Sequence, residues 1–399
     1  MLTLGVPRES APGEARVALV PQVVATLIKS GWTIRVEAGA GTAASFPDRA
    51  YQDAGATVVP DTRGAFECDV VLKVREPRAR EDLGLHEADF LRLGAVLIGF
   101  FNAQKNPEVL EKLVAGGVTV LAMERLPRIS RAQSMDALSS MSTVAGYKAV
   151  LIAAATLPRF FPLMMTAAGT VAPARAFVLG AGVAGLQAIA TARRLGAVVE
   201  AFDVRPAVRE EVQSLGATFV APELASESSV GAGGYARGTT EEDERRMREV
   251  IGATVLNADV VIATANVPGR RAPVMITAAM VERMKPGSVI VDLAAESGGN
   301  CELTSPGADV VRHGVTIRGP INLAATVPVH ASQMYARNLG ALLQHLARDG
   351  ALELDFSDEI TRGLCLAHGG RRMDTAPAAP TPAAAAGPAP TTPPAALRT

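Results

Sequence analysis

The sequence predicts an α/β protein built from two doubly wound, parallel-sheet domains with a cleft between them. The chain has 399 residues, 48% of them hydrophobic, which is enough for two packed domains of about 150 to 200 residues each. Short apolar runs alternate with helical segments over residues 1–125, and the alternation starts again at residue 174. Such alternation is typical of a parallel sheet that helices cover on both faces.

In the first half, five apolar runs are expected to form strands, over residues 2–6, 33–37, 70–74, 95–99 and 118–122. Residues 21–29 are expected to form a helix, with Pro21 in its first turn and Gly31 beyond its end. A second helix should start at Pro107 and stop before Gly116. Proline at the first helical position and glycine past the last one are typical helix boundaries.

The second half repeats this arrangement, with strands expected at residues 176–179, 198–202, 218–220, 260–264, 288–291 and 315–318. A long Ser/Ala-rich helix over residues 135–157 should bridge the two domains, and a helix over residues 331–347 should return to the first one. The predicted domains are therefore residues 1–134 with 327–375, and residues 135–326.

A glycine-rich turn gives the strongest functional signal. Gly180, Gly182 and Gly185 follow an apolar strand and open a helix, and Asp203 stands eighteen residues beyond Gly185 at the end of the next strand. In a Rossmann-like unit the three glycines allow the tight turn, the approach of a pyrophosphate and close helix packing. The phosphates then lie at the helix N-terminus. The predicted cofactor site also includes Val183, Ala184, Val204, Arg205 and Ala265.

Asp203 favours NAD(H) over NADP(H) as the dinucleotide. A carboxylate there can accept hydrogen bonds from both ribose hydroxyls, whereas a 2′-phosphate would meet a like charge at a cost of about 4 kcal/mol at 4 Å and intermediate dielectric. Arg205 argues the other way, because a nearby arginine can accept that phosphate. It could equally contact the pyrophosphate or lie on the adenine.

Two segments lack the apolar periodicity of helices or strands. Residues 224–240 contain several glycines around Gly234 and Tyr235 and are expected to form a mobile loop near the nucleotide, although a plain disordered insertion would have the same composition. The tail over residues 376–399 is almost entirely Ala, Pro and Thr, which predicts disorder.

Composition argues against several other classes of protein. The formal net charge is −1 and the chain has one Trp and four Tyr, so nucleic acid is not an expected partner. Cys68, Cys301 and Cys365 show no metal-ligand spacing, which predicts no metal site and suits a reducing cytoplasm. The N-terminus lacks the pattern of a signal peptide. The most apolar run, residues 149–157, is much shorter than the roughly 20 residues that cross a bilayer, so no membrane span is expected.

A polar segment precedes the bridging helix. Gln133, Asp136 and Ser139 recur every three residues, and Arg128 lies just before them. This spacing predicts a polar ledge along one face of a helix start. A solvated capping region would show the same pattern.

Four segments together resemble the NAD(H)-binding domain of the proton-translocating nicotinamide nucleotide transhydrogenases. They are the ledge, the fingerprint at residues 178–203, the loop at residues 233–236 and the run at residues 291–302. The resemblance covers residues 1–365 and implies that Arg128, Gln133, Asp136 and Ser139 bind the nicotinamide end of NADH. It also implies NADP(H) on a partner subunit, a membrane-spanning proton-conducting subunit, a homodimer, and a peripheral position at the cytoplasmic face of the inner membrane.

The alanine dehydrogenases share this scaffold and supply the alternative activity. By that resemblance Arg16 and Lys73 would hold a substrate carboxylate and Glu296 would replace the catalytic aspartate, although both basic residues could be inherited scaffold or surface charge. The dehydrogenases' histidine would follow the strand at residues 95–99, where this chain has Phe100-Phe101-Asn102. Two catalytic positions are thus altered. A non-catalytic NAD(H)-sensing module is the remaining alternative.

Overall fold

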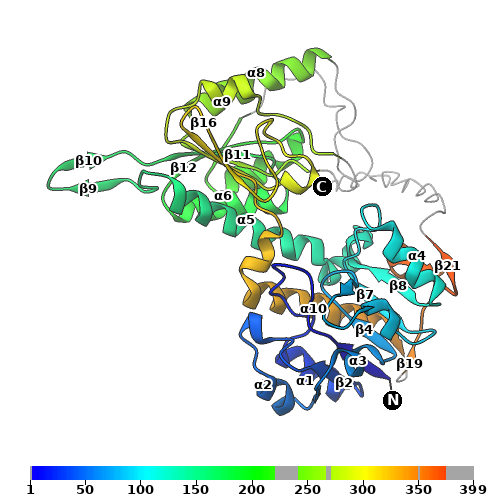
Figure 1. Ribbon diagram of the computed structural model, residues 1–399. Helices are drawn as coiled ribbons and strands as arrows, with labels where there is room; N and C mark the ends of the chain where they lie inside the picture. The colour runs from blue at the N-terminus through cyan, green and yellow to red at the C-terminus, as the bar shows by residue number, and fades with distance from the viewer. Residues whose placement is uncertain (1, 221–240, 267–270, 349–350, 374–399) are drawn as a thin grey trace, which may run out of the picture.

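The computed structural model describes residues 2–220, 241–266, 271–348 and 351–373, which form two α/β lobes (Figure 1). Each lobe is built on its own sheet of mainly parallel strands. The α/β fold with two parallel sheets predicted from the sequence is confirmed.

The first lobe holds an eight-stranded sheet in the order β21-β20-β8-β7-β4-β1-β2-β3. Its strands are β1 (Thr3–Val6), β2 (Thr33–Glu37), β3 (Thr57–Val59), β4 (Val70–Leu72), β7 (Val96–Gly99), β8 (Thr119–Ala122), β20 (Cys365–His368) and β21 (Arg371–Arg372). The pairs from β3 to β8 are parallel, whereas β20 and β21 are antiparallel additions at one edge. The five expected strands are confirmed to within two residues, and β3, β20 and β21 were not foreseen.

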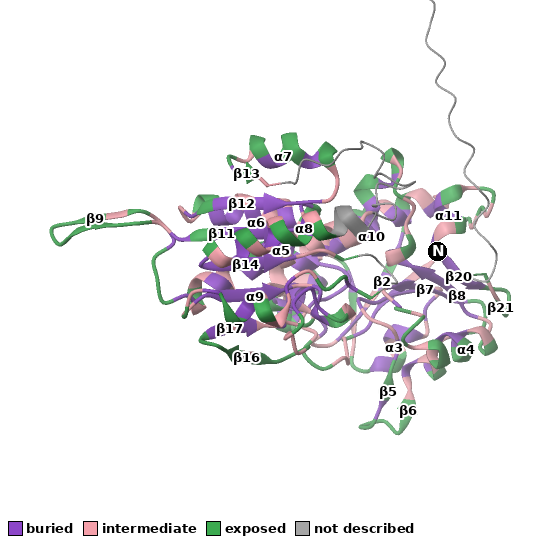
Figure 2. Ribbon diagram, turned by 90° about the horizontal axis from the view of Figure 1, so that it is seen from above, coloured by how far each residue is buried: buried purple, intermediate pink, exposed green. Residues whose placement is uncertain are grey.

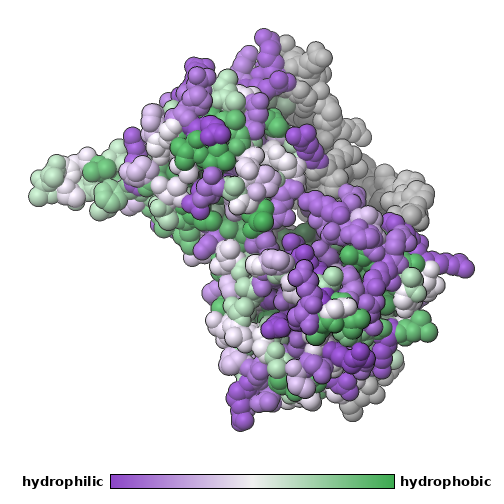
Figure 3. Space-filling model, viewed as in Figure 1, coloured by the Kyte–Doolittle hydropathy of each residue, from purple (hydrophilic) through white to green (hydrophobic). Residues whose placement is uncertain are grey.

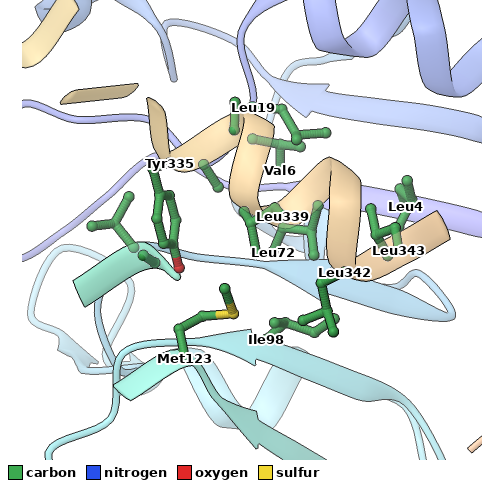
Figure 4. Close-up of a cluster of buried hydrophobic side chains, with 14 of the residues drawn as sticks. Leu4, Val6, Leu19, Leu72, Ile98, Met123, Tyr335, Leu339, Leu342 and Leu343 are labelled. Carbon is green, nitrogen blue, oxygen red and sulfur yellow. The ribbon is translucent and has the colours of Figure 1, made fainter. Parts of the chain in front are cut away.

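Helices cover both faces of this sheet. They are α1 (Pro21–Lys29), α2 (Asp48–Asp53), α3 (Thr62–Phe66), α4 (Pro107–Ala115), α10 (Pro328–Leu346) and α11 (Glu359–Leu364). Helix α10 starts at Pro328, three residues before the expected position, because proline suits the first helical turn. Its apolar face, including Tyr335, Leu339 and Leu343, packs over Leu4 and Leu72 of the sheet (Figure 4).

The second lobe holds a seven-stranded sheet in the order β13-β12-β11-β14-β15-β17-β16. Its strands are β11 (Arg175–Leu179), β12 (Val198–Phe202), β13 (Thr218–Phe219), β14 (Val260–Ala263), β15 (Val289–Asp292), β16 (Asp309–Arg312) and β17 (Val315–Arg318). Only β16 runs antiparallel. The six expected strands are confirmed to within one residue. The direction of winding reverses between β11 and β14, which is where ligands bind in sheets of this topology.

The helices of this lobe are α5 (Ala137–Thr156), α6 (Val183–Arg194), α7 (Arg209–Ser214), α8 (Glu241–Asn257) and α9 (Ala278–Glu282). Figure 2 shows that the central strands of this sheet are mostly buried, whereas the helices carry exposed residues. Four short strands form two hairpins, β5 (Ala79–Arg80) with β6 (Leu85–His86) and β9 (Met164–Thr166) with β10 (Gly169–Val171). A further short pair joins β18 (Ala347–Arg348) to β19 (Ala351–Leu352).

Helix α5 ties the two lobes together, as its sequence predicts. Ala137, Met141 and Val144, in its first half, belong to the core of the first lobe, whereas Ala149 and Ala153, in its second half, belong to the core of the second. This double burial explains its apolar composition. Among the described residues α5 is the one helix that is long and apolar enough to cross a membrane, and 39% of its most apolar window is buried inside the protein.

Candidate nucleotide-binding site

The glycine turn has the geometry that its sequence predicts. Gly180 follows β11 with φ +96°, in the left-handed region that favours glycine. A Cβ on Gly185 would lie 1.8 Å from the carbonyl oxygen of Gly180, so close packing of helix and turn excludes any side chain there. At Gly182 no atom of the described residues, its two chain neighbours aside, lies within 4 Å of a Cβ position. The chain thus leaves space at the one glycine where a phosphate would approach.

This turn lies where the topology places a ligand site. It connects β11, at the point where the winding reverses, to the N-terminus of α6. The first amide groups of a helix have no partners within the helix and carry its positive dipole end. Val183 and Ala184 form the first turn of α6 and are at least partly exposed, so their amides are available to an anion.

Asp203 is held beside the turn. It follows β12 and is 9% exposed, and its Oδ2 accepts a hydrogen bond from the Ala181 amide at 2.7 Å. Its other partner is Arg205, whose backbone amide and Nε donate to Oδ1 at 2.9 Å each and whose Nη2 donates to Oδ2 at 3.0 Å. A carboxylate offers about four acceptor positions, and all four are in use. Ribose hydroxyls could therefore bind Asp203 only after the Arg205 guanidinium turns away.

Ala265 is held by buried polar side chains that were not among the predicted site residues. The Ala265 carbonyl accepts a hydrogen bond from Asn300 Nδ2 at 2.7 Å. Asn300 is itself placed by Asp292 at the end of β15, whose Oδ2 accepts from the amides of Asn300 and Cys301 and from the Thr304 hydroxyl. Both Asp292 and Asn300 are fully buried. The sequence signal was present, because this Asp ends an apolar strand and this Asn lies in the loop that follows, but their contact with Ala265 depends on the tertiary fold.

The ledge differs from the single helix face that was expected. Residues Ser130–Met135 form a 3₁₀ helix, η4, and α5 starts only at Ala137. Asp136 is the N-cap of α5: its Oδ1 accepts from the Ser139 amide at 2.9 Å, and its Oδ2 accepts from the Ser139 hydroxyl at 2.6 Å. Gln133 and Ser139 therefore do not share one helix face, because Asp136 between them has ψ 88°, outside the helical region. The capping arrangement is present, while Arg128 and Gln133 lie exposed before it.

The ledge and the glycine turn are connected through one helix contact. A Cβ on Gly146 of α5 would lie 2.1 Å from the Ala184 carbonyl oxygen of α6, so the two helix backbones touch there. Ser139 lies seven residues before Gly146, which is about 10 Å along a helix. The predicted nicotinamide residues therefore stand at a fixed distance from the predicted phosphate site.

The junction of the lobes brings together loops that follow strands of both sheets. Lys105 Nζ, beyond β7, donates to the Glu296 carbonyl at 3.0 Å. The Asn322 amide, beyond β17, donates to Glu296 Oε1 at 2.6 Å. These loops leave the carboxyl ends of their strands, so the carboxyl ends of both sheets point toward the junction of the lobes. In α/β proteins, ligands bind at that end of the strands. Figure 3 shows the surface constricted between the lobes.

Arg16 is engaged at this junction rather than lying on the surface. Its side chain is 4% exposed, its Nε and Nη2 donate to Glu14 at 2.7 and 2.6 Å, and Nη2 also donates to Asn322 Oδ1 at 2.9 Å. Burial by itself raises the pKa of Glu14, but the hydrogen bonds and charge of Arg16 lower it below its ordinary value. A buried pair so fully hydrogen-bonded is a structural link between the lobes.

Lys73 is also buried, between two carboxylates. Its side chain is 1% exposed, with Nζ 3.4 Å from Glu9 and 3.2 Å from Glu87. Burial opposes its charge, but these carboxylates raise the pKa of Lys73 above its ordinary value. The suggestion that Arg16 and Lys73 are surface charges is therefore wrong.

Where the alanine dehydrogenases would have their histidine, this chain has Phe100. The Phe100 ring stacks on the Tyr335 ring, with 5.4 Å between the ring centroids.

Some expected features lie outside the described residues. Gly234 and Tyr235 and the tail at 376–399 lie outside them. The three cysteines are buried free thiols, and burial raises the pKa of Cys301 and of Cys365 to about 11. Within residues 2–220, 241–266, 271–348 and 351–373, no cluster of three His, Cys, Asp or Glu side chains could hold a metal ion.

The sheet order, the glycine turn and the acid beyond the second strand define a two-lobed dinucleotide-binding α/β protein. Comparison with known families agrees: the model of the alanine dehydrogenase/PNT N-terminal domain matches residues 5–145, and that of the C-terminal domain matches residues 149–375. The chain belongs to the alanine dehydrogenase/PNT family and, within it, to the NAD(P) transhydrogenase alpha subunits.

Comparison with individual relatives agrees that this chain lies with the transhydrogenase alpha subunits. An NAD(P) transhydrogenase alpha-subunit chain of Rhodospirillum rubrum is 47% identical over 373 residues, covering 92% of this chain and 97% of that protein. The alanine dehydrogenase of Bacillus subtilis is 31% identical over 337 residues, covering 82% and 81%. The solved transhydrogenase structure from Sinorhizobium meliloti has a TM-score of 0.84 at 44% identity, covering 93% and 99%. An L-alanine dehydrogenase structure has a TM-score of 0.78 at 29% identity, covering 93% and 96%.

Proposed function

We propose that this chain binds NAD(H) in the second lobe and positions it for hydride transfer to or from NADP(H) held on a partner subunit, coupled to proton translocation by a membrane-spanning subunit. Residues 135–326 form the NAD(H)-binding domain in this proposal, and residues 1–134 with 327–375 form the other. The chain would lie at the cytoplasmic face of the inner membrane as a peripheral subunit, without nucleic acid as a partner. Membership of the NAD(P) transhydrogenase alpha subunits supports the hydride-transfer function and the existence of partner subunits.

The observation that carries this proposal is the contrast between the open glycine turn and two basic residues whose charges are already paired. Gly182 leaves room for a phosphate, and Asp203 stands beside it. Arg16 and Lys73, which an alanine dehydrogenase would use for a substrate carboxylate, are both paired with buried glutamates. Oxidative deamination needs a positioned acid or base, whereas hydride exchange between two nicotinamides transfers no proton to substrate. The residues present suit the second reaction.

NADH, when bound, supplies the hydride, and the chain's task is to fix the orientation of the reacting ring. In this proposal Gln133 and Arg128 contact the nicotinamide end directly, because both side chains are exposed beside the start of α5. Asp136 and Ser139 complete the set from the first turn of that helix, where their mutual hydrogen bonds hold both side chains in place.

Mixing the purified chain with an NADP(H)-binding partner subunit tests the proposal. The chain alone should bind NADH with little turnover, and addition of the partner should produce NADP⁺ reduction at the expense of NADH. Robust oxidation of L-alanine with NAD⁺ by the chain alone would show that the alanine dehydrogenase alternative is correct. Binding of NADH without hydride transfer to any such partner would instead indicate a sensing module.

Shortening Gln133 to asparagine should slow hydride transfer about tenfold or more at saturating nucleotides, because a displacement of about 1 Å at a positioning group can cost up to a hundredfold in rate. NADH affinity should change much less, since the phosphate and adenosine ends are held elsewhere. Stopped-flow mixing with the NADP(H)-loaded partner measures the rate. An unchanged rate would show that the ledge does not position the ring.

The β9–β10 hairpin supports the homodimer. It projects from the second lobe in Figures 1 and 2, and Leu163 and Met165 on it are 54% and 79% exposed. A lone two-stranded hairpin is marginally stable in water, and an exposed apolar group on it favours burial against another surface. We therefore propose that the hairpin packs against a second copy of the chain.

Replacing Met165 with glutamate should shift the chain from dimer to monomer, because burying the new charge in the interface would cost several kcal/mol. Sedimentation velocity measures the change. Val311→Glu is the matched control, since Val311 is another exposed apolar strand residue, 59% exposed on β16. Val311→Glu should sediment like the parent. If Met165→Glu also sediments like the parent, the hairpin is not the interface.

A further inference from the structure

The short helix η4, which presents Gln133, is held from two sides by the C-terminal part of the chain. Ala132 and Met135 of this helix are buried in the first lobe. The Ser134 carbonyl accepts a hydrogen bond from Asn338 Nδ2 of α10 at 2.8 Å. Gln133 is left exposed between these fixed points.

The second contact that fixes η4 is an ion pair between distant parts of the sequence. Arg131 Nη2 of η4 donates to Asp358 Oδ1, 227 residues away. Asp358 Oδ2 lies 2.7 Å from His345 Nε2 at the end of α10, and the same side chain caps α11 through the Thr361 amide. One carboxylate therefore joins η4, α10 and α11. A cavity of about 240 Å³ adjoins it, lined by Arg131, Asp358, His345, Glu353, Asp355 and Thr361.

This ion pair matters for position more than for stability. The Arg131 side chain is 52% exposed and that of Asp358 14%, and such partly solvated pairs contribute little to the free energy of unfolding. A 3₁₀ helix has weak internal hydrogen bonds, and the backbone bonds at the two ends of η4 join Ala132 to Ile129 and Asp136 to Gln133. The orientation of η4 thus depends on its outside contacts.

We propose that Asp358 is a positioning residue for hydride transfer, which fixes η4 through Arg131 and so fixes the side chain of Gln133. The proposal rests on the proposed function, since it matters only if Gln133 orients the nicotinamide. Asp358 does not touch the nucleotide. Its role is to keep η4 in one position while the two nicotinamide rings react.

The variant Asp358→Ser tests this role, because serine keeps a side-chain cap on α11 while removing the partner of Arg131. In the intact chain with its NADP(H)-binding partner, the hydride transfer rate at saturating nucleotides should fall about tenfold, and the NADH dissociation constant should change less than twofold. Amide hydrogen exchange over residues 131–136 should become faster. Asp61→Ser is the matched control, since Asp61 is also an aspartate cap on a short helix of this lobe, α3, and all three readouts should stay at the parent values.

Arg131→Gln supplies the second variant, since it removes the same ion pair from the other side and leaves the cap of α11 untouched. It should reproduce the rate loss, and the double variant should be no slower than either single one. If Gln133→Asn is slow while both variants transfer hydride and exchange amides like the parent, Asp358 has no positioning role. A loss of NADH affinity as large as the loss of rate would also overturn the proposal, because it would indicate general damage. An unchanged rate in Gln133→Asn would instead contradict the proposed function itself.

Discussion

Replacing Asp203 with alanine should weaken NADH binding about a hundredfold. A carboxylate at this position can accept hydrogen bonds from both ribose hydroxyls, and hydrogen bonds to a charged group contribute about 1.5 to 3 kcal/mol each. Loss of two of them costs about 3 kcal/mol, and every 1.4 kcal/mol is a factor of ten. The same change removes the acceptor for the Ala181 amide, which loosens the glycine turn. Isothermal titration of NADH into the parent and the variant measures the effect.

Titration of NADPH provides the control for this variant. Removal of the carboxylate eliminates its repulsion of a 2′-phosphate and releases Arg205 from its three hydrogen bonds to Asp203. NADPH binding should therefore weaken much less than NADH binding, or become stronger. Equal losses for both dinucleotides would show that Asp203 acts on the turn alone and does not select the ribose.

Most of the fold follows from the sequence because parallel strands buried on both faces are continuous apolar runs. All four residues of β7, β8, β14 and β15 are buried, and such runs are conspicuous between glycines. Apart from the 17-residue helix α8, the elements that were missed are short or lie at or near sheet edges. Helices α2, α3 and α7 have six residues or fewer, too few to establish a period. Strands β16 and β21 lie at sheet edges, and β20 lies next to β21, so their pairing depends on distant segments.

In the candidate site, too, the local features could be predicted from the sequence and the contacts between distant residues could not. Turn geometry is local, so the roles of Gly180 and Gly185 in the fold could be predicted from spacing alone. The capping of α5 by Asp136 was visible as an alternative to the ledge, and both describe the same side chains. Pairing between distant residues could not be predicted, because nothing in the spacing of Arg131 and Asp358 shows that α11 returns to η4.

The other large effect is expected at Gly182, and its comparison with Gly185 separates binding from folding. Gly182 has φ −76°, which any residue can adopt. A methyl group there would meet no atom of the described part of the chain within 4 Å, its two chain neighbours aside. Gly182→Ala should therefore fold like the parent. Gly185→Ala places its methyl 1.8 Å from the Gly180 carbonyl oxygen and should destabilise the chain by about 3 kcal/mol or more. Thermal unfolding measures both.

The effect of the two substitutions on NADH affinity should not follow their effect on stability. The Gly182→Ala methyl occupies the space that a pyrophosphate needs, and overpacking of this kind costs about 2 to 3 kcal/mol, so NADH affinity should fall about thirty- to a hundredfold. Adenosine, which has no phosphate, should bind the parent and Gly182→Ala equally. If Gly182→Ala keeps the parent affinity for NADH, the phosphates lie elsewhere, because a ligand that approaches the first turn of α6 closely cannot avoid this methyl group.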